Sequence, residues 1–202
     1  MKTTFFSRIA YKLMVIVIAI SYTLTPYVGP SEDDHIQTNE QTGANLTAVL
    51  WADPQFSNYL VKRTKYFDAA CEDVTKNVDG KVDVMLNAGD IAENGLLCEY
   101  QYVAEKLADA KTNCFLNAVG NHDVRLKASY KKTVKNFTGF TNDLNKAVGS
   151  DFTMDALHYS YEINGYKFIV LGTDRTEFEE SYISEAQLCW LDAQLTEASK
   201  TG

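Results

Sequence analysis

The chain has 202 residues, of which 46% are hydrophobic and 23% charged, a composition that suits one globular domain and argues against disorder over most of the length. Its net charge is −8 at pH 7, and no run of basic residues is longer than a pair such as Lys131 and Lys132. An acidic surface repels polyanions, so we expect no nucleic-acid-binding surface, and a phosphate-containing substrate would need local neutralisation by bound cations.

The first thirty residues have the pattern of an export signal. A basic flank formed by Lys2, Arg8 and Lys12 precedes the apolar run LMVIVIAI at 13–20. Small residues follow at the spacing of a signal-peptidase site, but the apolar run extends further, so an uncleaved anchor stays open. We predict a signal peptide or N-terminal anchor over residues 1–30 and a secreted or extracytoplasmic protein, with a membrane tether as the alternative to free secretion.

Beyond a polar, unpatterned linker at 31–45, short apolar runs alternate with helical periods, which predicts an α/β layered domain over 46–202. Three successive strands are expected to end in a polar side chain. The predicted elements in chain order are a strand at 46–53, a helix from about 57 to 76, a strand at 83–90, a helix with Tyr100, Val103, Leu107 and Ala110 on one face, and a strand from 115 to 121. In α/β sheets, sites assemble at the carboxyl ends of the strands.

In the second half of the chain, a mixed segment is predicted to precede a β-hairpin and a helix. Residues 126–150 contain several lysines and read as an inserted helical cap or loop that covers a cleft, or as a solvated helix. Asn164 and Gly165 supply the positive φ angles of a type I′ turn and predict a β-hairpin. Ser184 and Gln187 predict an N-cap with a capping box. The helix that follows is expected to bury one face, made of Leu188, Leu191, Leu195 and Ala198.

Four cysteines are present, Cys71, Cys98, Cys114 and Cys189, without the spacing of a metal motif. In an exported protein an even number permits disulfides. Each cysteine falls in or near a predicted helix or strand that can bury a thiol as a small apolar side chain, so free thiols are favoured.

Polar side chains at the predicted strand ends offer oxygen ligands for divalent cations. Asp53, Asp90 and Asn121 are such donors, and Gly89 and Gly120 let the backbone turn sharply where the donors must converge. Each strand end alone is explained as well by a simple turn. Three in succession, with GNHD after the third, favour a metal site.

These motifs resemble those of a known family. GD at 89–90 with a glutamate three residues later, and GNHD at 120–123, resemble the second and third motifs of the calcineurin-like metallophosphoesterase superfamily. The stretches HYSYEINGYKFIVLGTD and SEAQLCWLDAQL resemble its later hairpin and helix, so the similarity covers roughly residues 46–200. It implies a four-layer α/β/β/α sandwich, a binuclear centre of two divalent ions (Mn, Fe, Zn or Mg, with Mn favoured) and hydrolysis of phosphomonoesters or phosphodiesters by metal-activated water.

Residue roles follow from the resemblance. It implies that Asp53 binds the first metal, that Asp90 bridges both metals, and that Asn121 binds the second and contacts substrate. His122 would stand beside the scissile phosphate, where it binds the phosphate or protonates the leaving group as a catalytic residue. Glu93 matches the acidic partner that orients this histidine.

Two further residues complete the candidate site. The first motif is ADPQ, with Gln55 where a histidine is usual, as in one branch of the superfamily. Because an amide oxygen is a harder donor than imidazole, we expect a preference for Mn or Mg over Zn at the first metal. Arg125 is a candidate for contact with substrate phosphate, and a solvated loop cation is the alternative that we favour.

The far end of the chain departs from the family pattern. The family completes its site with one histidine and then a Gly-His-x-His motif on later strands, and His158 does not match either. We therefore expect further ligands beyond Gly202, weak activity or none in the 202-residue chain alone, and a sheet edge with exposed apolar surface. The alternative function is a non-catalytic extracytoplasmic module that binds a metal or a phosphate ligand with the same fold.

Overall fold

The computed structural model describes residues 36–38, 43–57, 61–125, 130–174 and 181–200. The chain divides into two units, residues 1–33 and 34–202, and all described residues belong to the second. The predicted leader at 1–30 therefore lies outside the described residues, as does most of the predicted linker. None of the helices in the described ranges combines the length and the apolar character that spanning a bilayer requires.

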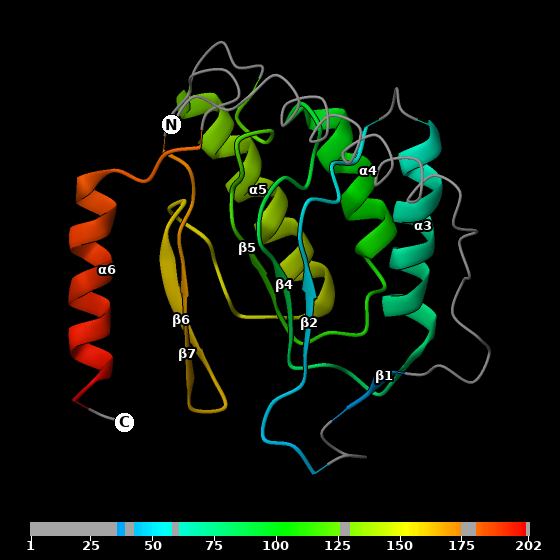
Figure 1. Cartoon of the computed structure of the whole chain (residues 1–202). Coiled ribbons are helices and arrows are strands. Elements are labelled where there is room, and N and C mark those ends of the chain that lie inside the picture. Colours follow the sequence, from blue (N-terminus) through cyan, green and yellow to red (C-terminus); the bar gives the residue numbers. More distant parts are fainter. Residues whose placement is uncertain (1–35, 39–42, 58–60, 126–129, 175–180, 201–202) are drawn as a thin grey trace, which may run out of the picture. The chain divides into compact units, whose positions relative to one another are not determined.

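The described part is a mixed α/β structure with four helices and three small sheets (Figure 1), which confirms the predicted α/β class. β2, β4 and β5 form a parallel sheet in the order β2-β4-β5, β6 and β7 form an antiparallel hairpin, and β1 and β3 form a short parallel pair. The elements in chain order are β1 (Ile36–Gln37), β2 (Ala48–Trp51), α3 (Val61–Lys76), β3 (Val78–Asp79), β4 (Val84–Asn87), α4 (Leu97–Leu107), β5 (Phe115–Asn117), α5 (Tyr130–Val148), β6 (Tyr159–Ile163), β7 (Tyr166–Val170) and α6 (Glu185–Ala198).

The three predicted strands that end in polar residues are confirmed as β2, β4 and β5, each shorter than expected. Their register places Leu50, Leu86 and Leu116 in one row across a single face of the sheet. Leu116 on β5 is 1% exposed, whereas Leu50 on β2 is 68% exposed. This row of leucines is therefore covered at β5 and exposed at β2, so the sheet has apolar surface exposed at its β2 side.

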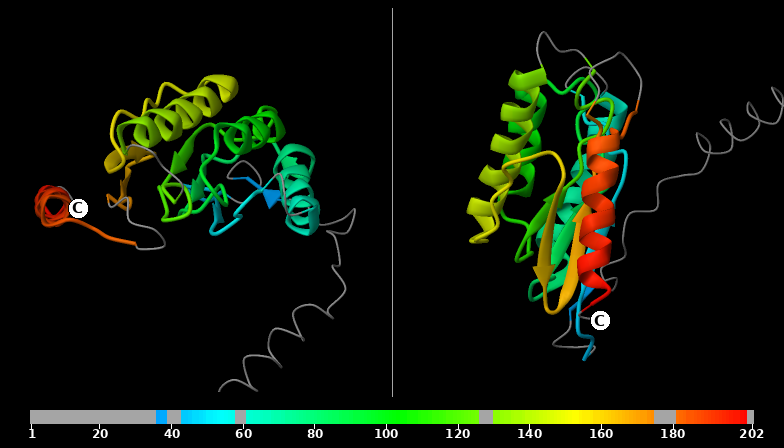
Figure 2. Two further views of the ribbon diagram at one scale, coloured as in Figure 1. Left: turned by 90° about the horizontal axis from the view of Figure 1, so that it is seen from above. Right: turned by 90° about the vertical axis from the view of Figure 1, so that its left-hand side faces the viewer.

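Helices α3, α4 and α5 cover one side of the parallel sheet (Figure 2). Tyr100 of α4 stacks on Phe140 of α5 with ring centroids 5.0 Å apart, and Phe137 packs edge-on against Tyr100 at 5.9 Å. The helix predicted within 126–150 is therefore present as α5, but its predicted role as an inserted cap or a solvated helix is wrong, because α5 packs in the core. Phe137, Phe140 and Leu144 recur at helical spacing, and the exposed lysines between them obscured this buried stripe.

The outer edge of β5 is closed by side chains. Asn145 of α5 accepts a hydrogen bond from the backbone N–H of Phe115 and donates one to its carbonyl oxygen, both at 2.9 Å. The hydroxyl of Tyr159 donates to the carbonyl oxygen of Asn117 at 3.1 Å. An amide side chain here replaces a neighbouring strand, so buried backbone groups at this edge are satisfied without further pairing.

The hairpin forms as predicted, with Asn164 and Gly165 at φ angles of 52° and 81°. The linker prediction at 31–45 needs a correction, because β1 lies within it and pairs with β3. The hydroxyl of Thr38 donates to the carbonyl oxygen of Asp79 at 2.9 Å. A two-residue strand carries no periodicity, so its sequence gives no signal of this pairing.

The start of α6 confirms one half of the predicted capping box. The backbone N–H of Gln187 donates to the Ser184 hydroxyl at 3.3 Å, as an N-cap requires. The Gln187 side chain instead lies buried, where it accepts from the N–H and donates to the carbonyl oxygen of Gly172, both at 2.9 Å. Leu188 and Leu195 are 43% and 53% exposed, so the predicted burial of this face is wrong for these two residues.

The four cysteines are free thiols, as favoured from the sequence. Cys71 and Cys114 are buried, whereas Cys98 and Cys189 are exposed. Burial raises the pKa of Cys71 to about 12 and that of Cys114 to about 11. Neither buried thiol is therefore ionised or accessible in the folded protein.

We expect the thiol reagent DTNB to label Cys98 and Cys189 in the folded protein and Cys71 and Cys114 only after denaturation. The reason is that the thiolate is the reactive species and must be accessible. The measurement is the thiol count before and after addition of guanidinium chloride. A Cys98→Ser, Cys189→Ser double variant serves as control and should give no signal while folded; rapid labelling of that variant would contradict the described burial.

Candidate metal and phosphate site

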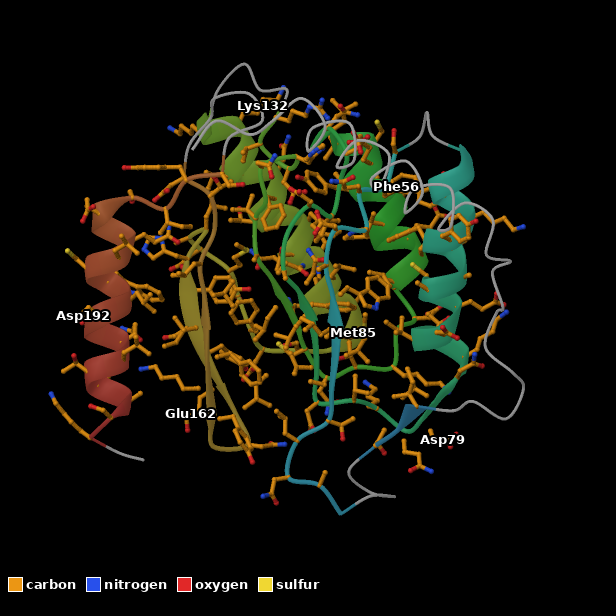
Figure 3. All side chains as sticks on the ribbon, in the orientation of Figure 1. Phe56, Asp79, Met85, Lys132, Glu162 and Asp192 are labelled. Atoms are coloured by element: carbon orange, nitrogen blue, oxygen red, sulfur yellow. The ribbon has the colours of Figure 1, made fainter. Side chains whose placement is uncertain are left out.

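The loops that follow β2 and β4 run side by side at the carboxyl end of the sheet. The backbone N–H of Asp53 donates to the carbonyl oxygen of Gly89 at 3.2 Å, and that of Gln55 donates to the carbonyl oxygen of Asp90 at 2.8 Å. Figure 3 shows Phe56, the next residue, at this end of the sheet. Parallel pairing thus brings two strand ends together, although they are far apart in the sequence.

Three of the predicted ligands have strained backbones. The φ angles of Asp53, Gln55 and Asp90 are 51°, 41° and 54°, and in the described ranges Asn164 is the remaining non-glycine residue with a positive φ. The turn of the hairpin accounts for Asn164. The left-handed conformation costs a non-glycine residue on the order of 1–3 kcal/mol, and such residues cluster at functional sites. Because the three residues are adjacent, this end of the sheet is the candidate functional site.

The side chain of Asp90 interacts with those of Asp53 and Gln55. Burial raises the pKa of Asp90 above its ordinary value, and the negative charge of Asp53 adds to this effect. Hydrogen bonds from the His122 backbone and the Gln55 side chain have the opposite effect and lower the pKa of Asp90. A bound cation would relieve the repulsion between the two carboxylates.

The donor chemistry fits one hard divalent cation held by Asp53, Gln55 and Asp90, because all three offer oxygen atoms. Within the described ranges, no group of three or more His, Cys, Asp or Glu side chains is placed to hold a metal ion. The expected ligand set differs from such a group, since it combines two carboxylates with the amides of Gln55 and Asn121.

Glycines allow the third strand end to reach this site. A Cβ atom on Gly120 would lie 2.1 Å from Oδ1 of Asp90, and Gly89, with a φ of 119°, faces the Gly120 backbone. The same Oδ1 of Asp90 accepts a hydrogen bond from the backbone N–H of His122 at 2.8 Å. Gly89 therefore makes the sharp turn expected from the sequence, whereas Gly120 is required for close approach, because a side chain there would separate the loops after β4 and β5.

The Asp123 side chain connects the loop after β4 to the loop after β5 by hydrogen bonds. Its buried carboxylate accepts hydrogen bonds from the backbone N–H groups of Ala92 and Gly120, both at 3.0 Å, and of Ile91 at 3.4 Å. The hydroxyl of Tyr100 donates to it at 3.2 Å. Sequence reasoning gave Asp123 no role, and its only signal was its place as the last residue of GNHD.

His122, Glu93 and Arg125 form one cluster, with side chains 18%, 15% and 19% exposed. Nδ1 of His122 lies 3.0 Å from the carbonyl oxygen and 3.6 Å from Oε1 of Glu93. Nη1 of Arg125 lies 3.0 Å from Oε1 of Glu93 and 3.2 Å from Nδ1 of His122. The solvated loop position that we favoured for Arg125 is therefore wrong, and its contact with substrate stays a prediction.

Asn121 has a different partner from the one expected. Its Oδ1 accepts a hydrogen bond from the Ser181 hydroxyl at 3.2 Å, a contact across 60 positions that sequence reasoning missed. The described contacts thus join Asp90 to Asp53, to Gln55 and to the His122 backbone. They direct the Asn121 side chain towards the segment before α6. Its role as a ligand stays a prediction.

An open cleft of about 610 Å³ lies beside the first two predicted ligands. Asp53 and Gln55 line it together with Trp51 and the apolar side chains of Leu50 and Phe67. A volume of this size suits a small molecule that carries one apolar group.

Comparison of the chain with models of protein families gives no match. Comparison with curated proteins gives no match either.

Proposed function

We propose that the chain is a hydrolase domain that cleaves phosphomonoesters or phosphodiesters with metal-activated water. The observation that carries this proposal is the convergence of three strained oxygen-donor residues, Asp53, Gln55 and Asp90, at the carboxyl ends of two parallel strands. Backbone strain at adjacent acidic residues reduces the stability of the fold, and a role in ligand binding explains why it is retained.

In this proposal Asp53, Gln55 and Asp90 hold one cation, and Asp90 with Asn121 holds a second. When bound, such ions make hydroxide available at neutral pH and neutralise phosphate charge. His122 contacts its partners through Nδ1, so Nε2 is the nitrogen that it offers to the phosphate or the leaving group. The partly buried backbone hydrogen bond to Asp90 keeps this imidazole beside the candidate metal ligands.

The proposal includes the four-layer α/β/β/α arrangement and a phosphate ester as ligand. Its support is that α3, α4 and α5 cover the parallel sheet, while α6 packs beside β7 of the hairpin. The hairpin is joined to β5 through the N–H of Thr173, which donates to the carbonyl oxygen of Val119 at 3.1 Å. An extracytoplasmic location rests on the leader pattern at 1–30.

Hydrolysis of p-nitrophenyl phosphate and bis(p-nitrophenyl) phosphate tests the proposal. Assays use the 202-residue chain and, in parallel, the polypeptide translated from the complete reading frame that encodes it. We expect hydrolysis that depends on Mn²⁺, stops with a chelator and returns with added Mn²⁺. Calorimetric titration with Mn²⁺ runs beside the assay, and absence of both binding and turnover would remove the proposal.

A second function is favoured by one contact. Because Asn121 is bound to Ser181, the described residues suit a single cation better than a pair. A non-catalytic module that binds a metal and a phosphate ligand needs only one cation. Binding of Mn²⁺ and inorganic phosphate without turnover in either polypeptide would establish this alternative.

Gln55→His is expected to change the metal preference. Imidazole is a softer donor than an amide oxygen, so the variant should gain affinity for Zn²⁺ over Mn²⁺ by on the order of tenfold. The measurement is competition between the two ions, followed by calorimetry. Gln55→Glu, which keeps an oxygen donor, is the matched control and should retain the preference for Mn²⁺; an unchanged preference in Gln55→His would show that residue 55 is not a ligand.

A further inference from the structure

The Arg125 side chain is mostly buried, although it directly follows a loop motif. Its side chain is 19% exposed, and Nη1 makes two contacts, to Oε1 of Glu93 at 3.0 Å and to Nδ1 of His122 at 3.2 Å. Its backbone N–H donates to the carbonyl oxygen of His122 at 3.2 Å, which closes a tight turn. Main chain and side chain therefore both fix Arg125 against His122.

Two groups compete for Nδ1 of His122. The carbonyl oxygen of Glu93, at 3.0 Å, can only accept, so it favours a proton on Nδ1. The guanidinium of Arg125, at 3.2 Å, can only donate, so it favours a bare Nδ1 with the proton on Nε2. The Glu93 carboxylate lies 3.6 Å from Nδ1 and pairs with the same guanidinium at 3.0 Å, so the two charges largely cancel at the ring and the N–H donor of Arg125 is what favours the bare Nδ1.

We propose that Arg125 is a positioning residue that holds neutral His122 in the tautomer with its proton on Nε2. Glu93 anchors the guanidinium by an ion pair in which both partners are mostly buried, so the fork is held in one orientation. Since Nδ1 is occupied, Nε2 carries the proton towards a ligand. Arg125 acts through His122 and does not itself touch the phosphate.

The consequence for chemistry rests on the proposed hydrolase function. The N–H on Nε2 can donate a hydrogen bond to the oxygen of the leaving group as its bond to phosphorus breaks and negative charge develops there; the ring stays neutral, and the released oxygen takes its proton from water. Such assistance matters most for a basic leaving group. Arg125 would therefore extend hydrolysis to esters with poor leaving groups.

Imidazole nitrogen NMR tests the tautomer without any requirement for activity. Two-bond ¹H–¹⁵N correlation spectra of the metal-free chain at mildly alkaline pH distinguish protonated from bare ring nitrogens. The three histidines are assigned with His35→Gln and His158→Gln. We expect Nε2–H for His122 in the wild type and in Arg125→Lys, which keeps a cationic donor, and Nδ1–H in Arg125→Ala; the same tautomer in wild type and Arg125→Ala would overturn the proposal.

Kinetics provide the second readout. In a polypeptide that hydrolyses p-nitrophenyl phosphate, Arg125→Ala should lower kcat for phenyl phosphate by about 100-fold and for p-nitrophenyl phosphate much less, because the second leaving group is a weaker base and needs little stabilisation by a hydrogen bond. Lys135→Ala, an exposed cation on α5, is the control. Equal losses on both substrates would overturn the role of Arg125 while hydrolysis stands. The expected tautomers without hydrolysis in any polypeptide would refute the hydrolase and leave the positioning of His122 intact.

Discussion

Asp90→Asn is expected to abolish metal-dependent hydrolysis, with a loss of at least about 100-fold in kcat. Asp90 is the one predicted ligand that the described contacts join to both halves of the site, through Gln55 on one side and the His122 backbone on the other. Asparagine keeps the size of the side chain and an oxygen acceptor for the His122 N–H. Only the charge is removed, so the change isolates the electrostatic contribution to metal binding.

The same variant has a second expected effect with the opposite sign. Burial raises the pKa of Asp90, which means that its negative charge opposes folding of the metal-free protein. Asparagine should therefore leave the thermal unfolding temperature of the metal-free chain unchanged or raise it, while Mn²⁺ no longer raises it further. Residues that bind ligands are often retained at such a cost to stability.

Kinetics and scanning calorimetry, each with and without Mn²⁺, measure both effects. Asp109→Asn is the matched control, because Asp109 is exposed and lies in the turn after α4. Wild-type activity and an unchanged thermal response to Mn²⁺ in Asp90→Asn would show that Asp90 is only a turn residue.

Asp123→Ala is expected to destabilise the fold by about 3–5 kcal/mol. The change removes the acceptor for the backbone N–H groups of Ile91, Ala92 and Gly120 and for the hydroxyl of Tyr100. Each buried donor left without a partner costs about 1–3 kcal/mol. Domains of this size are stable by about 5–15 kcal/mol, so the variant should lose a large share of its stability.

Equilibrium unfolding in urea gives the free energy, and a graded series keeps the test decisive. Tyr100→Phe removes one donor and leaves the carboxylate paired with the backbone, so its loss should be about 1 kcal/mol. A change in the free energy of unfolding below that value in Asp123→Ala would contradict the described role of this carboxylate.

Asp123 should also leave a signature in the pH dependence of stability. Burial raises its pKa from 3.8 to about 6, so the folded state binds this proton more tightly than the unfolded state. The contribution of Asp123 to the free energy of unfolding therefore decreases as pH rises from below 3.8 through about 6. Tyr100→Phe keeps this titrating group and should keep the decrease, with the pKa of Asp123 in the folded state raised further because the Tyr100 hydroxyl lowers it. Asp123→Asn should lose the decrease, and the comparison assigns it to Asp123.

The position of the candidate site could be predicted in part because its candidate ligands follow strands. Asp53, Asp90 and Asn121 come directly after apolar runs, and parallel pairing of β2, β4 and β5 places those ends at one edge. Arg125 and Asn121 show the limit of this reasoning. Their partners, Glu93 and Ser181, are chosen by loop geometry over 32 and 60 positions, for which a single sequence carries no periodic signal.

By itself, the sequence determined the features that depend on neighbouring residues. Hydrophobic periodicity set the strands and the helices α3 and α4, and Asn164 with Gly165 set the hairpin through their φ angles. Tertiary structure alone decided where polar side chains find partners. The Gln187 side chain bonds the buried Gly172 backbone instead of completing the predicted capping box, and Asp123 bonds the backbone of two loops. The reason is that an unpaired buried backbone group costs more free energy than an exposed cap contributes.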